Sequence, residues 1–103
     1  MAGPEGTVKL KIKEYLKSLE PSLWVFCPMS NGYGKRGVPD FVGVYRGRMF
    51  AIEAKAPGGK PKPWQERCMA EMANAGALVI LADNIDTVIQ AFKPFHDDPR
   101  YAL

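Results

Sequence analysis

Two strand-like runs, separated by only two residues, constrain the fold of this chain more than any other feature. Residues 40–45 (DFVGVY) and 48–55 (RMFAIEAK) are rich in Val, Ile, Phe and Tyr, and Arg46 and Gly47 lie between them. Such residues favour strands, and a two-residue connection favours a tight hairpin. We therefore predict an antiparallel hairpin in which Tyr45 pairs with Arg48.

The register of this hairpin predicts which polar side chains meet. Counting outward from the turn places Asp40 directly opposite Glu53, and alternation along the strand puts Lys55 on the same face as Glu53. Opposed residues have Cβ atoms about 5 Å apart, and like charges there are destabilising, so the two carboxylates need a compensating cation. Lys55 is one candidate for that cation, and a divalent metal ion is the other.

Helical patterns lie before and after the hairpin. Residues 5–19 repeat apolar side chains at the spacing of one helical face, and Pro21 ends this segment. A second helix is predicted over residues 63–75, because Pro63 suits a first helical turn and Gly76 suits a stop. Its inner face is expected to contain Trp64, Cys68, Met69 and Met72.

Two more apolar runs complete the predicted sheet. Residues 23–27 (LWVFC) form a short run bounded by prolines, which favours a strand that lies at an edge. Residues 77–82 (ALVILA) are apolar throughout, as in a strand that is covered on both faces and parallel to its neighbour. With a last short helix over residues 85–92, the order predicts one α/β domain over residues 1–103, a mixed sheet flanked by helices.

Composition limits the classes of protein and site. No window approaches the roughly 20 apolar residues of a membrane span, and the first residues lack the apolar run of a signal peptide, which predicts a cytoplasmic protein. Cys27 and Cys68 are too few for a disulfide framework or a four-ligand zinc site. The single histidine, His96, lies in a segment that resembles a tail, which argues against a catalytic Cys-His or Ser-His pair.

Basic residues gather in two loop-like stretches. The net charge of +3 and the pI near 9.0 permit a nucleic-acid partner without requiring one. The stretches SNGYGKRG and APGGKPKP lie next to Asp40 and Lys55 respectively. We predict stacking of a base on Tyr33 and phosphate contacts by Lys35, Arg36, Lys60 and Lys62. Solvated lysines and a packed tyrosine are the alternative interpretation.

The two carboxylates and the lysine suit the hydrolysis of a phosphodiester. Magnesium prefers oxygen ligands, usually one or two carboxylates together with waters and substrate phosphate, and Asp40 and Glu53 supply such a pair. A metal there would polarise the phosphate and activate water, while Lys55 would orient that water and offset developing charge. Alone, an acid and a lysine two residues apart are usually a solvated surface pair, so the combination carries the prediction.

The chain resembles the PD-(D/E)XK nucleases and, within them, the small VRR-NUC (virus-type replication-repair nuclease) domains. The resemblance spans residues 5–89 and is carried by Gly37-Val38-Pro39-Asp40, Glu53-Ala54-Lys55-Ala56-Pro57 and Gln65. It implies a restriction-endonuclease-like αβββαβ core followed by a short C-terminal helix. It also implies Mg²⁺ or Mn²⁺ bound by Asp40, Glu53 and the Ala54 carbonyl, with Lys55 as the catalytic lysine and Gln65 in support.

The family also has an acid on its first helix, for which Glu5 and Glu14 compete. At about 100° per residue, Glu5 falls within the apolar arc of the helix and Glu14 on the opposite side, which favours Glu5. A plain favourable charge in the first helical turn is the alternative role for Glu5. Gln65 likewise has the alternative of an ordinary exposed helix former.

The resemblance implies a DNA endonuclease that selects branched DNA, such as a four-way junction or flap, and acts as a homodimer without an organic cofactor. It would work in the cytoplasm of a bacterial or phage-infected cell. Two other functions compete with this hypothesis: a non-catalytic DNA-binding module with the same fold, and a protein-interaction domain with an accidental pair of acids. The absence of a helix-turn-helix or zinc-finger pattern predicts recognition of DNA shape and backbone.

Overall fold

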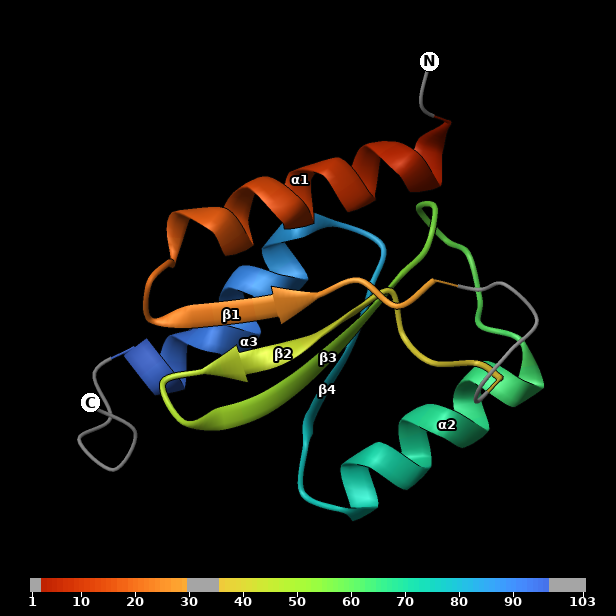
Figure 1. Ribbon diagram of the computed structural model, residues 1–103. Helices are drawn as coiled ribbons and strands as arrows, with labels where there is room; N and C mark the ends of the chain where they lie inside the picture. Colours follow the sequence, from red (N-terminus) through yellow and green to blue (C-terminus); the bar gives the residue numbers. More distant parts are fainter. Residues whose placement is uncertain (1–2, 30–35, 97–103) are drawn as a thin grey trace.

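The computed structural model describes residues 3–29 and 36–96, in which three helices surround a four-stranded sheet (Figure 1). The elements in chain order are α1 (Pro4–Ser18), β1 (Leu23–Phe26), β2 (Phe41–Tyr45), β3 (Arg48–Ala54), α2 (Pro63–Asn74), β4 (Leu78–Ala82) and α3 (Ile85–His96). This order confirms the predicted α/β class and the mixed sheet flanked by helices.

The sheet has the strand order β1-β2-β3-β4, with β1 and β4 at its edges. Strands β2 and β3 are antiparallel with Tyr45 opposite Arg48, which confirms the predicted register. The two turn residues, Arg46 (φ 50°) and Gly47 (φ 89°), both adopt the left-handed conformation of a tight two-residue hairpin turn. Strand β4 is parallel to β3, as predicted, so both strands end at the same edge of the sheet.

One face of the sheet, here called the inner face, packs against α1 and α3. The buried side chains from both helices and from β2, β3 and β4 form a continuous apolar core: Val8, Ile12, Leu16, Phe41, Tyr45, Phe50, Ile52, Ile80, Ala82, Val88 and Phe92. The Phe92 ring stacks on Tyr45 and meets Phe50 edge to face, with centroids 5.3 and 5.2 Å away. The apolar stripes of the two helices therefore cover this face of the sheet.

The other face, here called the outer face, is only partly covered, by α2. A hollow of about 460 Å³ lies between this helix and the sheet, and Phe26 and Val42 line it opposite Cys68 and Met72. The prediction that residues 77–82 are covered on both faces was wrong, because β4 is an edge strand and Leu81 is 44% exposed. Cys68 and Met69 are buried as predicted. The prediction that Trp64 belongs to the inner face of the helix was wrong, because its side chain, in the first turn of α2, is exposed.

The last helix is longer than the sequence predicted, because α3 continues through Pro94 to His96. The His96 ring lies within hydrogen-bonding distance of the hydroxyl groups of Tyr15 and Tyr45. His96 is therefore part of the packing between α1, α3 and the sheet and not part of a tail. No helix in residues 3–29 and 36–96 is long and apolar enough to cross a membrane.

Candidate active site

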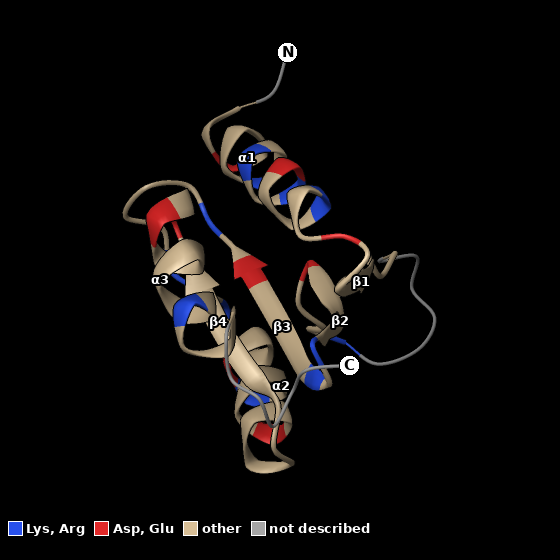
Figure 2. Ribbon diagram, turned by 90° about the vertical axis from the view of Figure 1, so that its left-hand side faces the viewer, with Lys and Arg blue, Asp and Glu red and all other residues tan. Residues whose placement is uncertain are grey.

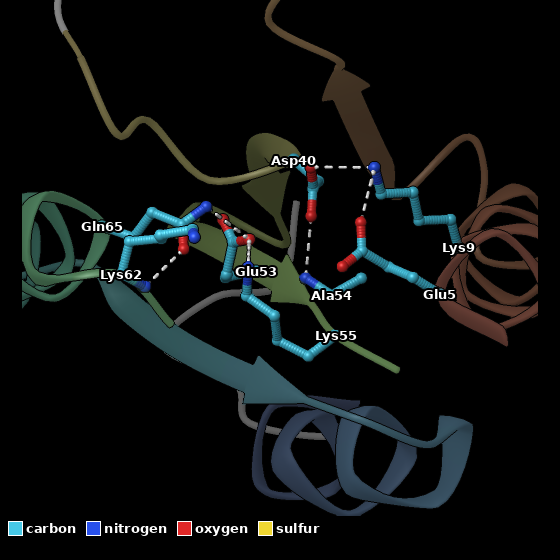
Figure 3. Close-up of polar contacts among 8 residues, drawn as sticks. All are labelled: Glu5, Lys9, Asp40, Glu53, Ala54, Lys55, Lys62 and Gln65. Atoms are coloured by element: carbon cyan, nitrogen blue, oxygen red, sulfur yellow. Dashed lines mark hydrogen bonds and ion pairs between the residues drawn. The ribbon is translucent and has the colours of Figure 1, made fainter. Parts of the chain in front are cut away.

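The acids and the lysine predicted from the sequence lie together at the end of the sheet where strand β3 finishes and strand β2 starts. Glu53 lies near the end of β3 and Lys55 follows it two residues later, and Figure 2 shows acidic red and then basic blue at this end of the strand. Figure 3 shows the first turns of α1 and α2 on opposite sides of this edge. Four segments that are distant in sequence therefore contribute side chains to one site.

Asp40 is held by contacts to both of its carboxylate oxygens. Its Oδ2 accepts a hydrogen bond from the Ala54 backbone N–H at 2.8 Å, and its Oδ1 lies 3.4 Å from Lys9 Nζ. The preceding Pro39 is fully buried. Gly37 (φ +84°) packs so closely on the first turn of α2 that a Cβ there would clash with the Trp64 carbonyl oxygen. Close packing of Gly37 and Pro39 thus fixes the position of Asp40.

Glu53 lies inside the site with a side chain only 3% exposed. Its Oε2 is 3.4 Å from Lys55 Nζ and accepts a hydrogen bond from Gln65 Nε2 at 3.3 Å. The Gln65 side chain is oriented in turn, because its Oε1 accepts a hydrogen bond from the Lys62 backbone N–H at 2.8 Å. The first turn of α2 therefore presents an amide to the carboxylate, and Gln65 is more than an exposed helix former.

Burial is the main reason that the pKa of Glu53 is raised to about 7, and the nearby charges of Asp40 and Glu5 add to the shift. Lys55 acts in the opposite direction without cancelling it. Burial would lower the pKa of Lys9, but the carboxylates of Asp40 and Glu5 outweigh that effect and the pKa is raised. Burial of Glu53 and the acids beside it therefore both favour its protonated form when no further cation is present.

The structure brings Glu5 close to the site and leaves Glu14 exposed elsewhere on α1. Glu5 reaches Asp40 through Lys9, whose Nζ is 3.4 Å from Glu5 Oε2. Sequence reasoning had overlooked Lys9. Its position one helical turn after Glu5 was the available signal, because residues four apart lie on the same side of a helix.

The predicted DNA-contacting residues are placed only in part. Arg36 lies over the Trp64 ring, 3.8 Å from its centroid, and Lys62 Nζ is 5.9 Å from the same centroid. Lys60 is exposed in the loop that follows β3. Tyr33 and Lys35 lie outside the described residues. Arg36 and Lys62 thus border the first turn of α2, beside Gln65.

The donor set at the site consists of hard oxygen atoms. Within residues 3–29 and 36–96, no group of three or more His, Cys, Asp and Glu side chains is arranged to hold a metal ion. Two carboxylates are nevertheless sufficient for Mg²⁺, which usually keeps several waters and takes the remaining ligands from substrate. The raised pKa of Glu53 beside Asp40 also fits a site that requires a cation.

Comparisons with known proteins agree with this architecture. The sequence matches no protein-family model. It is 44% identical over 54 residues to "Putative nuclease p44" of Acyrthosiphon pisum secondary endosymbiont phage 1. That match covers 52% of this chain and 58% of the relative, so the chain corresponds to only part of the relative's length.

Two solved structures share the fold. One, described as "VRR_NUC domain", has a TM-score of 0.74 and 26% identity, covering 92% of this chain and all of that one. The other, described as "VRR_NUC domain protein", has a TM-score of 0.66 and 19% identity, covering 90% and 88% of the two chains, and shows the shared fold alone. The near-complete structural match shows that this chain has the fold of a VRR_NUC domain, and about half of its sequence is similar to a phage protein that is named as a nuclease.

Proposed function

We propose that this chain is a metal-dependent DNA endonuclease whose active site is formed by Asp40, Glu53 and Lys55. The observation that carries the proposal is the convergence of a buried acid, a second acid and a lysine at the end of β3. Similarity to a phage protein named as a nuclease supports hydrolysis of nucleic acid.

Asp40, Glu53 and the Ala54 carbonyl would hold Mg²⁺ or Mn²⁺. In a strand, the N–H and C=O groups of one residue point to the same side. The Ala54 N–H faces Asp40, whereas the Lys55 N–H bonds to Ala82 on the other side, so the Ala54 carbonyl suits this role. When bound, the ion would supply Lewis-acid polarisation of the phosphate and a more acidic water.

The remaining residues would position the attacking water and the Glu53 carboxylate and would neutralise negative charge on the phosphate. The Lys55 ammonium, on a side chain that is only 13% exposed, would orient the attacking water and offset charge that develops on the phosphate. Gln65 would hold Glu53 in orientation through its amide, and Lys62 fixes Gln65 through the backbone. Glu5 would act at the margin of the site, through Lys9.

The test is DNA cleavage with Mg²⁺ or Mn²⁺ and with EDTA. We expect cleavage only with metal, and we expect Asp40→Asn, Glu53→Gln and Lys55→Met each to lower the rate by about 100-fold or more while the protein stays folded. Glu14→Gln, on the exposed side of α1, is the matched control and should retain full activity. Cleavage in EDTA, or an active Glu53→Gln variant, would contradict the assignment. DNA binding without any cleavage would indicate a non-catalytic module.

We further propose a homodimer that prefers branched DNA and acts in the cytoplasm of a bacterial or phage-infected cell. The outer face carries an exposed apolar row in which Trp24, Val44 and Met49 are cross-strand neighbours, 67%, 43% and 45% exposed. Contiguous exposed apolar surface often marks an interface. Two sites related by a two-fold axis would suit a junction with two-fold symmetry.

Light scattering and cleavage of matched substrates test this second proposal. We expect a dimer at assay concentrations and faster cutting of four-way or flapped DNA than of linear duplex. Replacement of Trp24 by Ser should weaken the dimer, whereas Leu10→Ser, at an exposed apolar position on α1, should leave it intact. A monomer that cuts linear and branched DNA equally fast would refute both the dimer and the preference.

A further inference from the structure

Lys9 lies between two acids at the site, and the proposed chemistry uses it only as the link between Glu5 and Asp40. Its Nζ is 3.4 Å from Glu5 Oε2 and 3.4 Å from Asp40 Oδ1 (Figure 3). The first of these contacts is a helical i,i+4 pair within α1, and the second links α1 to the segment that enters β2. Lys9 thus connects the first helix to one of the proposed metal ligands.

The two oxygens of Asp40 differ in what holds them. Oδ2 is bonded to a backbone N–H, which belongs to a central strand and cannot move away. Oδ1 contacts an ammonium on a long flexible side chain that is 41% exposed. A cation that approaches Oδ1 therefore meets a partner that is able to leave at little cost. Glu53 has a corresponding lysine, Lys55, but that side chain is only 13% exposed.

We propose that Lys9 is a displaceable counter-ion, a positioning residue that neutralises Asp40 without metal and lowers the affinity of the site for the divalent ion. The inference rests on the proposed metal site and deepens it, because it names a residue that sets metal affinity. Metal binding replaces the contact between Lys9 and Asp40 Oδ1, while Lys9 keeps its contact with Glu5. The acid on the first helix then acts by retaining the displaced lysine.

The size of the effect follows from the exposure of the pair. Partly exposed ion pairs change an equilibrium constant by at most about fivefold, and a positive charge that stays near the site adds repulsion toward the metal. We therefore expect Lys9→Met, which keeps the length of the side chain and removes its charge, to tighten Mn²⁺ binding by about 3- to 10-fold. Lys9→Arg should bind Mn²⁺ no more tightly than the wild type, because guanidinium also pairs with carboxylate.

The experiment is calorimetric titration of the full chain with MnCl₂, without DNA, for the wild type, Lys9→Met, Lys9→Arg and Lys13→Met. Lys13 is exposed one turn further along α1, so its variant controls for the loss of one positive charge. The rise in melting temperature on adding Mn²⁺ is a second readout, which should be larger for Lys9→Met than for the wild type. A purely structural role for Lys9 would lower the melting temperature with and without metal equally.

The measured Mn²⁺ affinities decide whether Lys9 lowers the affinity of the site for the metal. Tighter binding by Lys9→Met, with Lys9→Arg and Lys13→Met unlike it, supports the proposal. Equal affinity of Lys9→Met and the wild type overturns it and leaves the metal site intact, as does an equal gain in Lys13→Met. Failure of every variant to bind Mn²⁺ overturns the metal site, and the role of Lys9 with it.

Discussion

The two faces of the sheet differ in how far helices cover them, in how exposed their side chains are and in whether they carry charge. On the inner face, α1 and α3 cover the sheet, and the side chains that form the core there are apolar and at most 6% exposed. On the outer face, α2 covers part of the sheet, Glu53 is buried, and Trp24, Val44 and Leu81 remain exposed. Stability therefore resides mainly on the inner face, and the outer face and its edge are available for charge and for contacts with other molecules.

Adjacent residues on β4 test this division directly. Ile80 points to the inner face and is 4% exposed, whereas Leu81 points to the outer face and is 44% exposed. We expect Ile80→Ala to lower the free energy of unfolding by about 2–5 kcal/mol, because it leaves a cavity in a closed core. Leu81→Ala should cost less than about 1 kcal/mol. Urea denaturation measures both losses, and equal losses would show that the two faces contribute equally to stability.

Glu53 is the exception on the outer face, since it is buried and charged, and it should destabilise the metal-free protein. Its pKa is raised to about 7 in the folded state, so the folded state binds its proton more tightly than the unfolded state does. The resulting stability is present below the unfolded pKa near 4.5 and is lost as the pH rises through about 7. The loss by pH 8 is on the order of 3 kcal/mol.

Glu53→Gln removes this titration. In EDTA we expect the variant to gain stability relative to the wild type between pH 5 and pH 8, by about 2–3 kcal/mol in urea denaturation. Glu14→Gln, at an exposed position on α1, should show no such change across the same range. A constant difference between Glu53→Gln and the wild type at both pH values would contradict the raised pKa.

The sequence was sufficient to place the central pair of acids, because hairpin geometry depends on local spacing alone. Counting from Arg46 and Gly47 gave the observed register of β2 and β3 and brought Asp40 to the end of β3. The face of α1 that carries Glu5 also followed from periodicity. These inferences needed no knowledge of how the helices pack on the sheet.

The features that were missed depend on where helix ends lie in three dimensions. Lys9 contacts Asp40 only because the first turn of α1 reaches the edge of the sheet. The apolar run that forms β4, residues 77–82, suggested burial on both faces. Coverage of Leu81 depends, however, on the position of α2. His96 was assigned to a tail, since its contacts with Tyr15 and Tyr45 come from distant segments.

Gly37 links the outer-face helix to the site, and its replacement should separate steric fit from backbone strain. Gly37 and Gly58 both have positive φ, +84° and +80°, but only at Gly37 would a Cβ meet the backbone of α2. We expect Gly37→Ala to cost about 1–3 kcal/mol and to lower cleavage as well, because Asp40 shifts relative to Gln65. Gly58→Ala, with open space around it, should cost less, and equal costs in urea denaturation would show that strain alone matters.

The smallest expected effects concern the basic residues beside α2. Arg36, Lys60 and Lys62 lie near the first turn of that helix, and Lys17 lies in the last turn of α1, about 18 Å along the helix from Glu5. Each phosphate contact that is neutralised should lower the slope of log affinity against log salt by about 0.9 on duplex DNA and weaken binding to all sequences alike. We expect Arg36→Gln, Lys60→Gln and Lys62→Gln to behave in this way in fluorescence anisotropy with EDTA, and Lys17→Gln to leave the slope unchanged. If Lys17→Gln has the same effect as the other three, the DNA responds to net charge, and the edge of the outer face is not its binding surface.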